Sequence, residues 1–218
     1  MELHLRDLHL PMRHPFTIAL GTTTLQHNLL VELRQDGHSG YGEGASSHAY
    51  HGFTADSMRA ALEAARATIE AFRLGDPTEL WDRLLPVLGH NRFALCALDE
   101  AAQDLWGKLR GAPVWRLWGL DLTRIPLSDY TIGIDPVERM VAKMKEFDGW
   151  PIYKIKLGTP DDLAIVRELR RHTDAVFRID ANTAWTADQT IAFAPELKRL
   201  GVEFIEQPLP ASDWDGMK

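Results

Sequence analysis

The strongest constraint on the fold of this chain is a regular alternation of short apolar segments with longer amphipathic ones after residue 125. Short strands that alternate with helices of about 10–15 residues are typical of βαβ units, which form a parallel sheet with right-handed crossovers. We therefore expect strands and helices in strict alternation. The strands are expected over 127–132, 152–157, 175–179 and 202–205, and the helices over 136–147, 160–172 and 186–200.

The first 120 residues have a different pattern. Polar and apolar residues alternate over 2–10 and 29–33, and a glycine-rich stretch follows at 36–44, which indicates an antiparallel meander with one solvated face. Apolar residues at helical spacing then predict three helices between 54 and 111. The pattern therefore predicts an α+β segment at 1–120, followed at 121–218 by βαβ units with a parallel sheet.

Composition narrows the function classes. The 218 residues include 24 Lys and Arg against 31 Asp and Glu, a net charge of −7, which argues against nucleic acid as a partner. The single cysteine, Cys96, allows neither an internal disulfide nor a thiolate zinc cluster and fits a reducing compartment. The chain has no signal-like or membrane-spanning apolar run, so we expect a cytoplasmic protein without a membrane partner.

Charged residues lie on strands that should be apolar in a parallel sheet. Lys154 and Lys156 alternate with apolar residues on one strand, Asp180 ends the next and precedes Asn182, and Glu206 ends the fourth. Side chains alternate between faces, and the carboxyl ends of barrel strands are where catalytic residues gather. Solvated lysines at a sheet edge, or carboxylates that cap helices, would explain each residue singly. Their repetition on three successive strands favours one common site.

These residue types suggest a reaction. Two carboxylates, Asp180 and Glu206, without cysteine or a paired histidine form an oxygen site suited to Mg²⁺. Beside two lysines, such an ion suits removal of a proton α to a carboxylate, because it holds the enediolate oxygens while a lysine takes the proton. We also expect Lys154 and Lys156 to lower each other's pKa, so that one acts as a base near neutrality.

Three segments resemble known motifs. The sequences YKIKLG at 153–158, RIDANTAW at 178–185 and EFIEQPLP at 203–210 are similar to successive barrel strands of the enolase superfamily, in the muconate-lactonizing-enzyme subgroup. DYTIGI at 129–134 resembles the first barrel strand of its dipeptide epimerases. The resemblance implies an α+β N-terminal capping domain at 1–120 and, at 121–218, an incomplete (β/α) TIM-type barrel with about four strands. It also implies a Mg²⁺-dependent dipeptide epimerase. Such an enzyme inverts a carbon α to a carboxylate by lysine-mediated 1,1-proton transfer through a metal-stabilised enediolate.

The resemblance also implies roles for single residues. Lys156 would be the catalytic acid/base, and Lys154 would bind and stabilise the substrate carboxylate. Asp180 and Glu206 would bind Mg²⁺, and Thr131 would lie near the substrate.

Asn182 is expected to contact and orient the metal ligands without binding the metal itself. Two capping-domain loops, at 15–28 and 48–52, would close over the site. The first contains no Lys or Arg, which favours a small substrate with a neutral or apolar side chain, either a dipeptide or another carboxylate.

Alternatives remain open at this stage. A muconate cycloisomerase or an o-succinylbenzoate synthase-type lyase would use the same ion and base. A full barrel takes about 250 residues, so the segment after 125 holds only about three βα units and a strand. We therefore expect the N-terminal part of a longer protein, whose third metal-binding carboxylate and opposite-face lysine lie on later strands. The chain alone could be catalytically silent and form a homo-oligomer through its open edges.

Overall fold

The computed structural model describes residues 1–46 and 52–218, which form two compact units. The first unit comprises Met1–Met12 and Leu25–Ile125, and the second comprises Arg13–Thr24 and Pro126–Lys218. Most of the expected loop at 48–52 lies outside the described residues.

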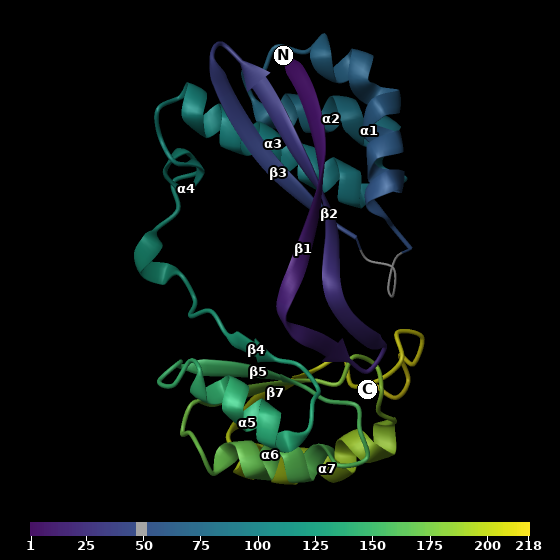
Figure 1. Cartoon of the computed structure of the whole chain (residues 1–218), viewed down its shortest axis with the longest axis vertical. Coiled ribbons are helices and arrows are strands. Elements are labelled where there is room, and N and C mark those ends of the chain that lie inside the picture. Colours follow the sequence, from purple (N-terminus) through teal and green to yellow (C-terminus); the bar gives the residue numbers. More distant parts are fainter. Residues whose placement is uncertain (47–51) are drawn as a thin grey trace. The chain divides into compact units, whose positions relative to one another are not determined.

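The first unit is a three-stranded sheet with helices on one face (Figure 1). Strand order is β1-β2-β3, and β2 and β3 are antiparallel, which confirms the expected meander and the three helices that follow it. The turn between β2 and β3 has a positive φ at both Asp36 (51°) and Gly37 (78°), as tight hairpins require. The elements of this unit are β1 (Glu2–Ile18), β2 (Gly21–Gln35), β3 (His38–Ala45), α1 (Ala55–Glu70), α2 (Pro77–Leu88), α3 (Arg92–Leu109), α4 (Val114–Leu117) and a 3₁₀ turn, η1 (Leu122–Arg124).

The glycine-rich stretch of β3 lets α3 approach the sheet closely. A Cβ atom at Gly42 would lie 2.0 Å from the carbonyl oxygen of Ala97, and one at Gly40 would lie 2.3 Å from that of Ala101. Real Cβ atoms do not approach backbone so closely. Glycines on the strand and alanines on the helix therefore allow this contact.

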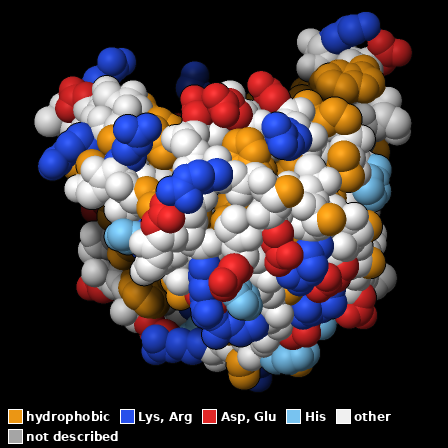
Figure 2. Space-filling model, turned by 90° about the horizontal axis from the view of Figure 1, so that it is seen from above, with side chains coloured by type: hydrophobic (Ala, Val, Ile, Leu, Met, Phe, Trp, Pro, Cys, Tyr) orange, Lys and Arg blue, Asp and Glu red, His pale blue; other side chains and the backbone are white. Residues whose placement is uncertain are grey.

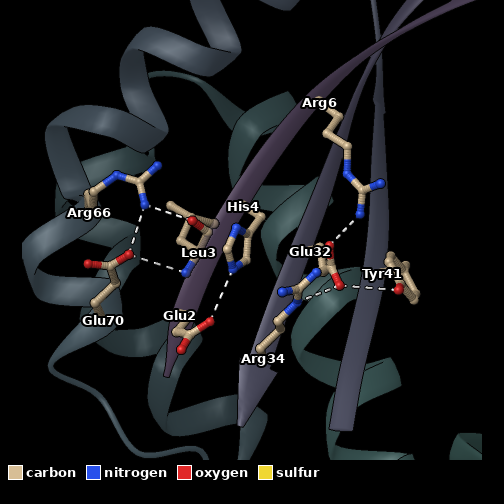
Figure 3. Close-up of polar contacts among 9 residues, drawn as sticks. All are labelled: Glu2, Leu3, His4, Arg6, Glu32, Arg34, Tyr41, Arg66 and Glu70. Atoms are coloured by element: carbon tan, nitrogen blue, oxygen red, sulfur yellow. Dashed lines mark hydrogen bonds and ion pairs between the residues drawn. The ribbon is translucent and has the colours of Figure 1, made fainter. Parts of the chain in front are cut away.

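Helix side chains form hydrogen bonds with backbone groups on both edge strands of this sheet. Leu3 of β1 donates its N–H to Glu70 at 3.2 Å, and its carbonyl accepts from Arg66 at 2.7 Å (Figure 3). On β3, the N–H of Tyr41 donates to Asp104 at 2.8 Å. Side chains that satisfy edge groups in this way discourage pairing with a strand of another chain.

The second unit contains the alternating βα segments. Its strands form a parallel sheet in the order β4-β5-β6-β7, with α5, α6 and α7 on one face (Figure 1), as the sequence predicts. Tyr153, Ile155 and Phe177 are buried toward the helices. The elements are β4 (Tyr130–Ile132), α5 (Val137–Lys145), β5 (Ile152–Lys156), α6 (Asp162–Arg170), β6 (Val176–Asp180), α7 (Ala187–Arg199) and β7 (Val202–Glu206).

The first of these strands is shorter than expected. β4 begins at Tyr130 rather than at residue 127, because its pairing with β5 starts at Tyr130 opposite Tyr153. Leu127 is 63% exposed and lies outside the sheet.

The tip of the β1–β2 hairpin belongs to the second unit. The tip comprises residues 13–24, which lie between the two alternating segments, 2–10 and 29–33, that predicted the antiparallel sheet. The carbonyl of Thr17 accepts a hydrogen bond from the N–H of Ile134 at 2.9 Å, just after β4. The hairpin tip therefore contacts the carboxyl end of the parallel sheet.

No helix among the described residues is long and apolar enough to cross a membrane. Basic and acidic side chains are interspersed on the face seen in Figure 2. Neighbouring charges on this face therefore compensate one another in large part.

Candidate active site

The strand register brings the predicted site residues together within the second unit. Lys156 at the end of β5 pairs with Asp180 at the end of β6, and Asp180 pairs with Glu206 at the end of β7. Two residues before Lys156 on β5, Lys154 pairs with Thr131 of β4. The three charged strand ends therefore lie at one level of the sheet.

The charged side chains point away from the helices. Their strand neighbours Tyr153 and Ile155 are 1% and 0% exposed in the apolar core, as the alternation of side chains requires. On the opposite face, Asp180 is 1% exposed and Lys156 is 8% exposed. Such burial of charged groups is tolerated only when they are paired.

The pairing is a continuous chain of ion pairs. Lys156 Nζ lies 2.5 Å from Asp180 Oδ2, and Lys154 Nζ lies 3.2 Å from the same oxygen. Lys154 Nζ also lies 2.6 Å from Glu206 Oε2. The ammonium of Lys154 is thus held between the two carboxylates that were predicted as metal ligands.

These contacts shift the pKa values in opposite senses. Burial raises the pKa of the Asp180 carboxyl, but hydrogen bonds from Lys156, from the Asn182 N–H and from Lys154 outweigh it, so that the pKa is lowered. Burial also lowers the pKa of Lys154, yet the Glu206 and Asp180 carboxylates raise it above its usual value. The expectation that neighbouring lysines lower each other's pKa is therefore wrong for Lys154, because carboxylates lie within hydrogen-bonding distance of its ammonium.

The loops after β6 and β7 contain residues with a left-handed backbone conformation, and hydrogen bonds connect them. Asn182, Thr183 and Gln207 have φ values of 45°, 68° and 43°. The Asn182 N–H donates to Asp180 Oδ1 at 2.9 Å, and the Thr183 N–H donates to the carbonyl of Gln207 at 2.7 Å. Asn182 thus supports the Asp180 carboxylate through its backbone, and the role of its side chain stays a prediction.

Two contacts of the hairpin tip reach the site. The resemblance implied that segment 15–28 closes over the site, but no motif singled out either tip residue. The ring centroid of Phe16 lies 6.0 Å from Lys156 Nζ, and a Cβ at Gly158 would lie 2.8 Å from the Cβ of Ala19. Both tip residues are distant in sequence from the strand motifs. The substrate contact predicted for Thr131, which is half-buried, stays a prediction.

The donor set suits a small divalent cation. Among residues 1–46 and 52–218, no group of three or more His, Cys, Asp or Glu side chains is arranged to hold a metal ion. Mg²⁺, however, commonly uses one or two protein carboxylates and takes its other oxygens from water and substrate. Asp180 and Glu206 already share one cationic group, the Lys154 ammonium, so their oxygens converge closely enough to share a positive charge.

A separate cavity lies in the first unit. It measures about 590 Å³ and is lined by β1, β2 and α1. Figure 3 shows its charges paired with one another: Glu32 accepts from Arg6 and Arg34, and Glu70 accepts from Arg66. This pairing indicates a structural ion network rather than a reactive site.

Comparison with known proteins shows the family of this chain. The model of the mandelate racemase / muconate lactonizing enzyme N-terminal domain matches residues 1–119, and an enolase C-terminal domain-like model matches residues 137–218. The chain belongs to the mandelate racemase / muconate lactonizing enzyme family. The resemblance to the enolase superfamily and the expected capping domain with a partial barrel are thereby confirmed.

Individual members of the family are similar over the whole chain. The L-Ala-D/L-amino acid epimerase of a Maribacter species is 50% identical, over 100% of this chain and 64% of that protein. The substrate-liganded L-Ala-D/L-Glu epimerase of Bacillus subtilis has a TM-score of 0.91 at 25% identity, and also covers 100% of this chain and 64% of its own.

A third relative was solved with its ligands. The dipeptide epimerase of Enterococcus faecalis, in complex with Mg and L-Leu-L-Tyr, has a TM-score of 0.87 at 30% identity, over 100% of this chain and 63% of that one. The chain therefore spans slightly less than two thirds of the length of these relatives.

Proposed function

We propose that the protein carrying this chain is a Mg²⁺-dependent dipeptide epimerase that acts by proton transfer at the carbon α to a carboxylate. The observation that supports this most directly is the alignment of Lys156, Asp180 and Glu206 at one level of three neighbouring strands. The epimerase names of the relatives favour this reaction over the cycloisomerase and lyase alternatives.

In this proposal each charged residue has a separate task. Lys156, once deprotonated to the neutral amine, takes the α-proton, since its side chain is the more buried of the two and lies at the strand end. Lys154 binds the substrate carboxylate. At an effective dielectric of about 20, one charge pair at about 4 Å contributes about 4 kcal/mol, or about three decades of rate if it acts only in the transition state.

Asp180 and Glu206 hold the metal ion in the same proposal. Bound there, Mg²⁺ supplies positive charge that stabilises the negative charge on the substrate carboxylate as the α-proton leaves. Asp180 suits this role because its pKa is lowered, which keeps it ionised. The backbone N–H of Asn182 fixes one of its oxygens and leaves the other facing the site.

The hairpin tip bears on the substrate class. Segment 15–28 contains no Lys or Arg, and its residues near the site include Phe16 and Ala19. An anionic substrate side chain would find no cationic partner in this segment. We therefore propose a dipeptide whose side chains are neutral or apolar.

Proton exchange in D₂O tests this function. The full-length protein with Mg²⁺ should incorporate deuterium at the α-carbon of L-Ala-L-Leu or L-Ala-L-Phe faster than at that of L-Ala-L-Glu, as measured by NMR. Lys156→Met should lower the exchange rate by at least about 100-fold, because it removes the base but keeps the side-chain volume.

The exposed Lys145 of α5 provides the matched control, and Lys145→Met should leave the rate unchanged. Absence of exchange on every dipeptide of a broad panel would refute the epimerase proposal. Exchange that survives in Lys156→Met would refute the role of that lysine.

A further inference from the structure

A buried carboxylate outside the proposed reaction organises the loop after β5. Asp162, at the start of α6, is 1% exposed. It accepts hydrogen bonds from the N–H of Gly158 at 3.0 Å, and from both the N–H and the hydroxyl of Thr159 at 2.8 Å. These donors lie two and three positions after Lys156, so Asp162 fixes the backbone that follows the predicted base.

The same carboxylate reaches the loop of the next strand. Asp162 Oδ2 accepts a hydrogen bond of 2.7 Å from the indole N–H of Trp185, a buried residue five positions after Asp180. The backbone N–H of Trp185 in turn donates to the carbonyl of Pro208 at 2.9 Å, two positions after Glu206. One chain of contacts therefore joins the loops after β5, β6 and β7.

We propose that Asp162 and Trp185 act as a pair of positioning residues that hold Lys156 in register with Asp180 and Glu206. Neither residue touches the substrate in this proposal, which rests on the function proposed above. The 2.5 Å contact between Lys156 and Asp180 lies at the strand ends where the loops after β5 and β6 begin, and the buried pair connects these two loops. A shift of about 1 Å between a base and its reacting partner is enough to cost about 100-fold in rate.

The hairpin tip is seated on the same loop. Gly158 donates its N–H to Asp162 and has a φ of 122°. A Cβ at Gly158 would lie 2.8 Å from the Cβ of Ala19 and 2.9 Å from the Cβ of Ala184. Fixing Gly158 therefore also fixes the surface that the tip contacts. The pair is expected to affect the catalytic step more than the initial binding of substrate.

Two substitutions break the link, and the first of them is nearly isosteric. Asp162→Asn leaves a single acceptor oxygen, and its amide N–H₂ cannot accept from the indole N–H. Trp185→Phe removes the indole donor and keeps an aromatic ring beside Phe193, whose centroid lies 5.2 Å away. Thr159→Ala is the matched control, because it removes a hydroxyl bonded to Asp162 and leaves the link between the loops intact.

The test uses the full-length protein with two separate readouts. At saturating Mg²⁺, Asp162→Asn and Trp185→Phe should each lower kcat by about 10- to 100-fold and change the dipeptide KM by less than about threefold. Calorimetric titration with Mg²⁺ alone, without dipeptide, should show weaker metal binding in both variants. The double variant should be no worse than the poorer single one, since both remove one interaction.

A merely structural role predicts a different pattern. Thermal unfolding would then change while kcat and Mg²⁺ affinity stay at their normal values in the folded variants, and that outcome would overturn the positioning role. An equal loss of kcat in Thr159→Ala would also overturn it. A wild-type protein without exchange activity would contradict the proposed function instead, and the Mg²⁺ titration would still decide the pair.

Discussion

Glu32 illustrates how one buried charge depends on its partners. Its side chain is 2% exposed, and hydrogen bonds from Arg34, and then from Arg6, Ser39 and Tyr41, outweigh burial and lower its pKa to about 2 (Figure 3). Because the pKa is lower in the folded state, the ionised carboxylate stabilises the fold above its ordinary pKa of 4.5. This stabilisation is lost as the pH falls from 4.5 toward 2.

Glu32→Gln should therefore destabilise the fold at neutral pH and much less in acid. We expect the free energy of unfolding in urea to fall by about 1–3 kcal/mol at pH 7, because charge-assisted hydrogen bonds are lost in a buried position. The difference from the parent chain should shrink as the pH approaches 2. Glu2→Gln is the control, since Glu2 is exposed and pairs only with His4 among the described contacts. An equal loss in the free energy of unfolding at pH 7 and at pH 2 would contradict the role assigned to the Glu32 charge.

At the scale of elements, the contact of β3 with α3 depends on the absence of side chains. Gly42→Ala would place a Cβ 2.0 Å from the backbone of Ala97, so either the strand or the helix must move. We expect a loss of about 1–3 kcal/mol in the free energy of unfolding. Gly75→Ala has open space around its Cβ and should be neutral within about 0.5 kcal/mol. Similar unfolding curves for the two variants would show that α3 can retreat from the sheet without cost.

The sequence predicts elements that carry their own periodic signal. The alternation after residue 125 identified every helix and strand of the parallel sheet, and the register then brought Lys156, Asp180 and Glu206 to one level. Contacts between distant segments left no periodic signal. The hairpin tip with Phe16, and the bond between Asp162 and Trp185, depend on tertiary folding. The raised pKa of Lys154 has the same origin, because Glu206 lies 52 residues away.

At the scale of the whole molecule, the parallel sheet has an open side at β7. Within residues 1–46 and 52–218, β7 is the last strand in the sheet order and pairs with β6 alone. Phe204 on β7 is 44% exposed, and Ile191 on α7 is 70% exposed. In a closed barrel a further βα unit covers such a strand and its neighbouring helix. An open apolar edge favours association with another chain.

We therefore expect the isolated 218-residue chain to self-associate and not to form the epimer. Both lysines of the site project from β5, so they approach a substrate from one side, whereas inversion needs a proton delivered to the opposite side. The Glu206 side chain is also 39% exposed to water, which weakens its electrostatic contact with Lys154. Chiral chromatography after incubation with Mg²⁺ and dipeptide should show the epimer with the full-length protein and none with the chain alone. Light scattering should show a mass above 24.6 kDa that Phe204→Lys reduces. Formation of the epimer by the isolated chain would contradict this expectation and show that β4–β7 with the hairpin tip suffice for catalysis.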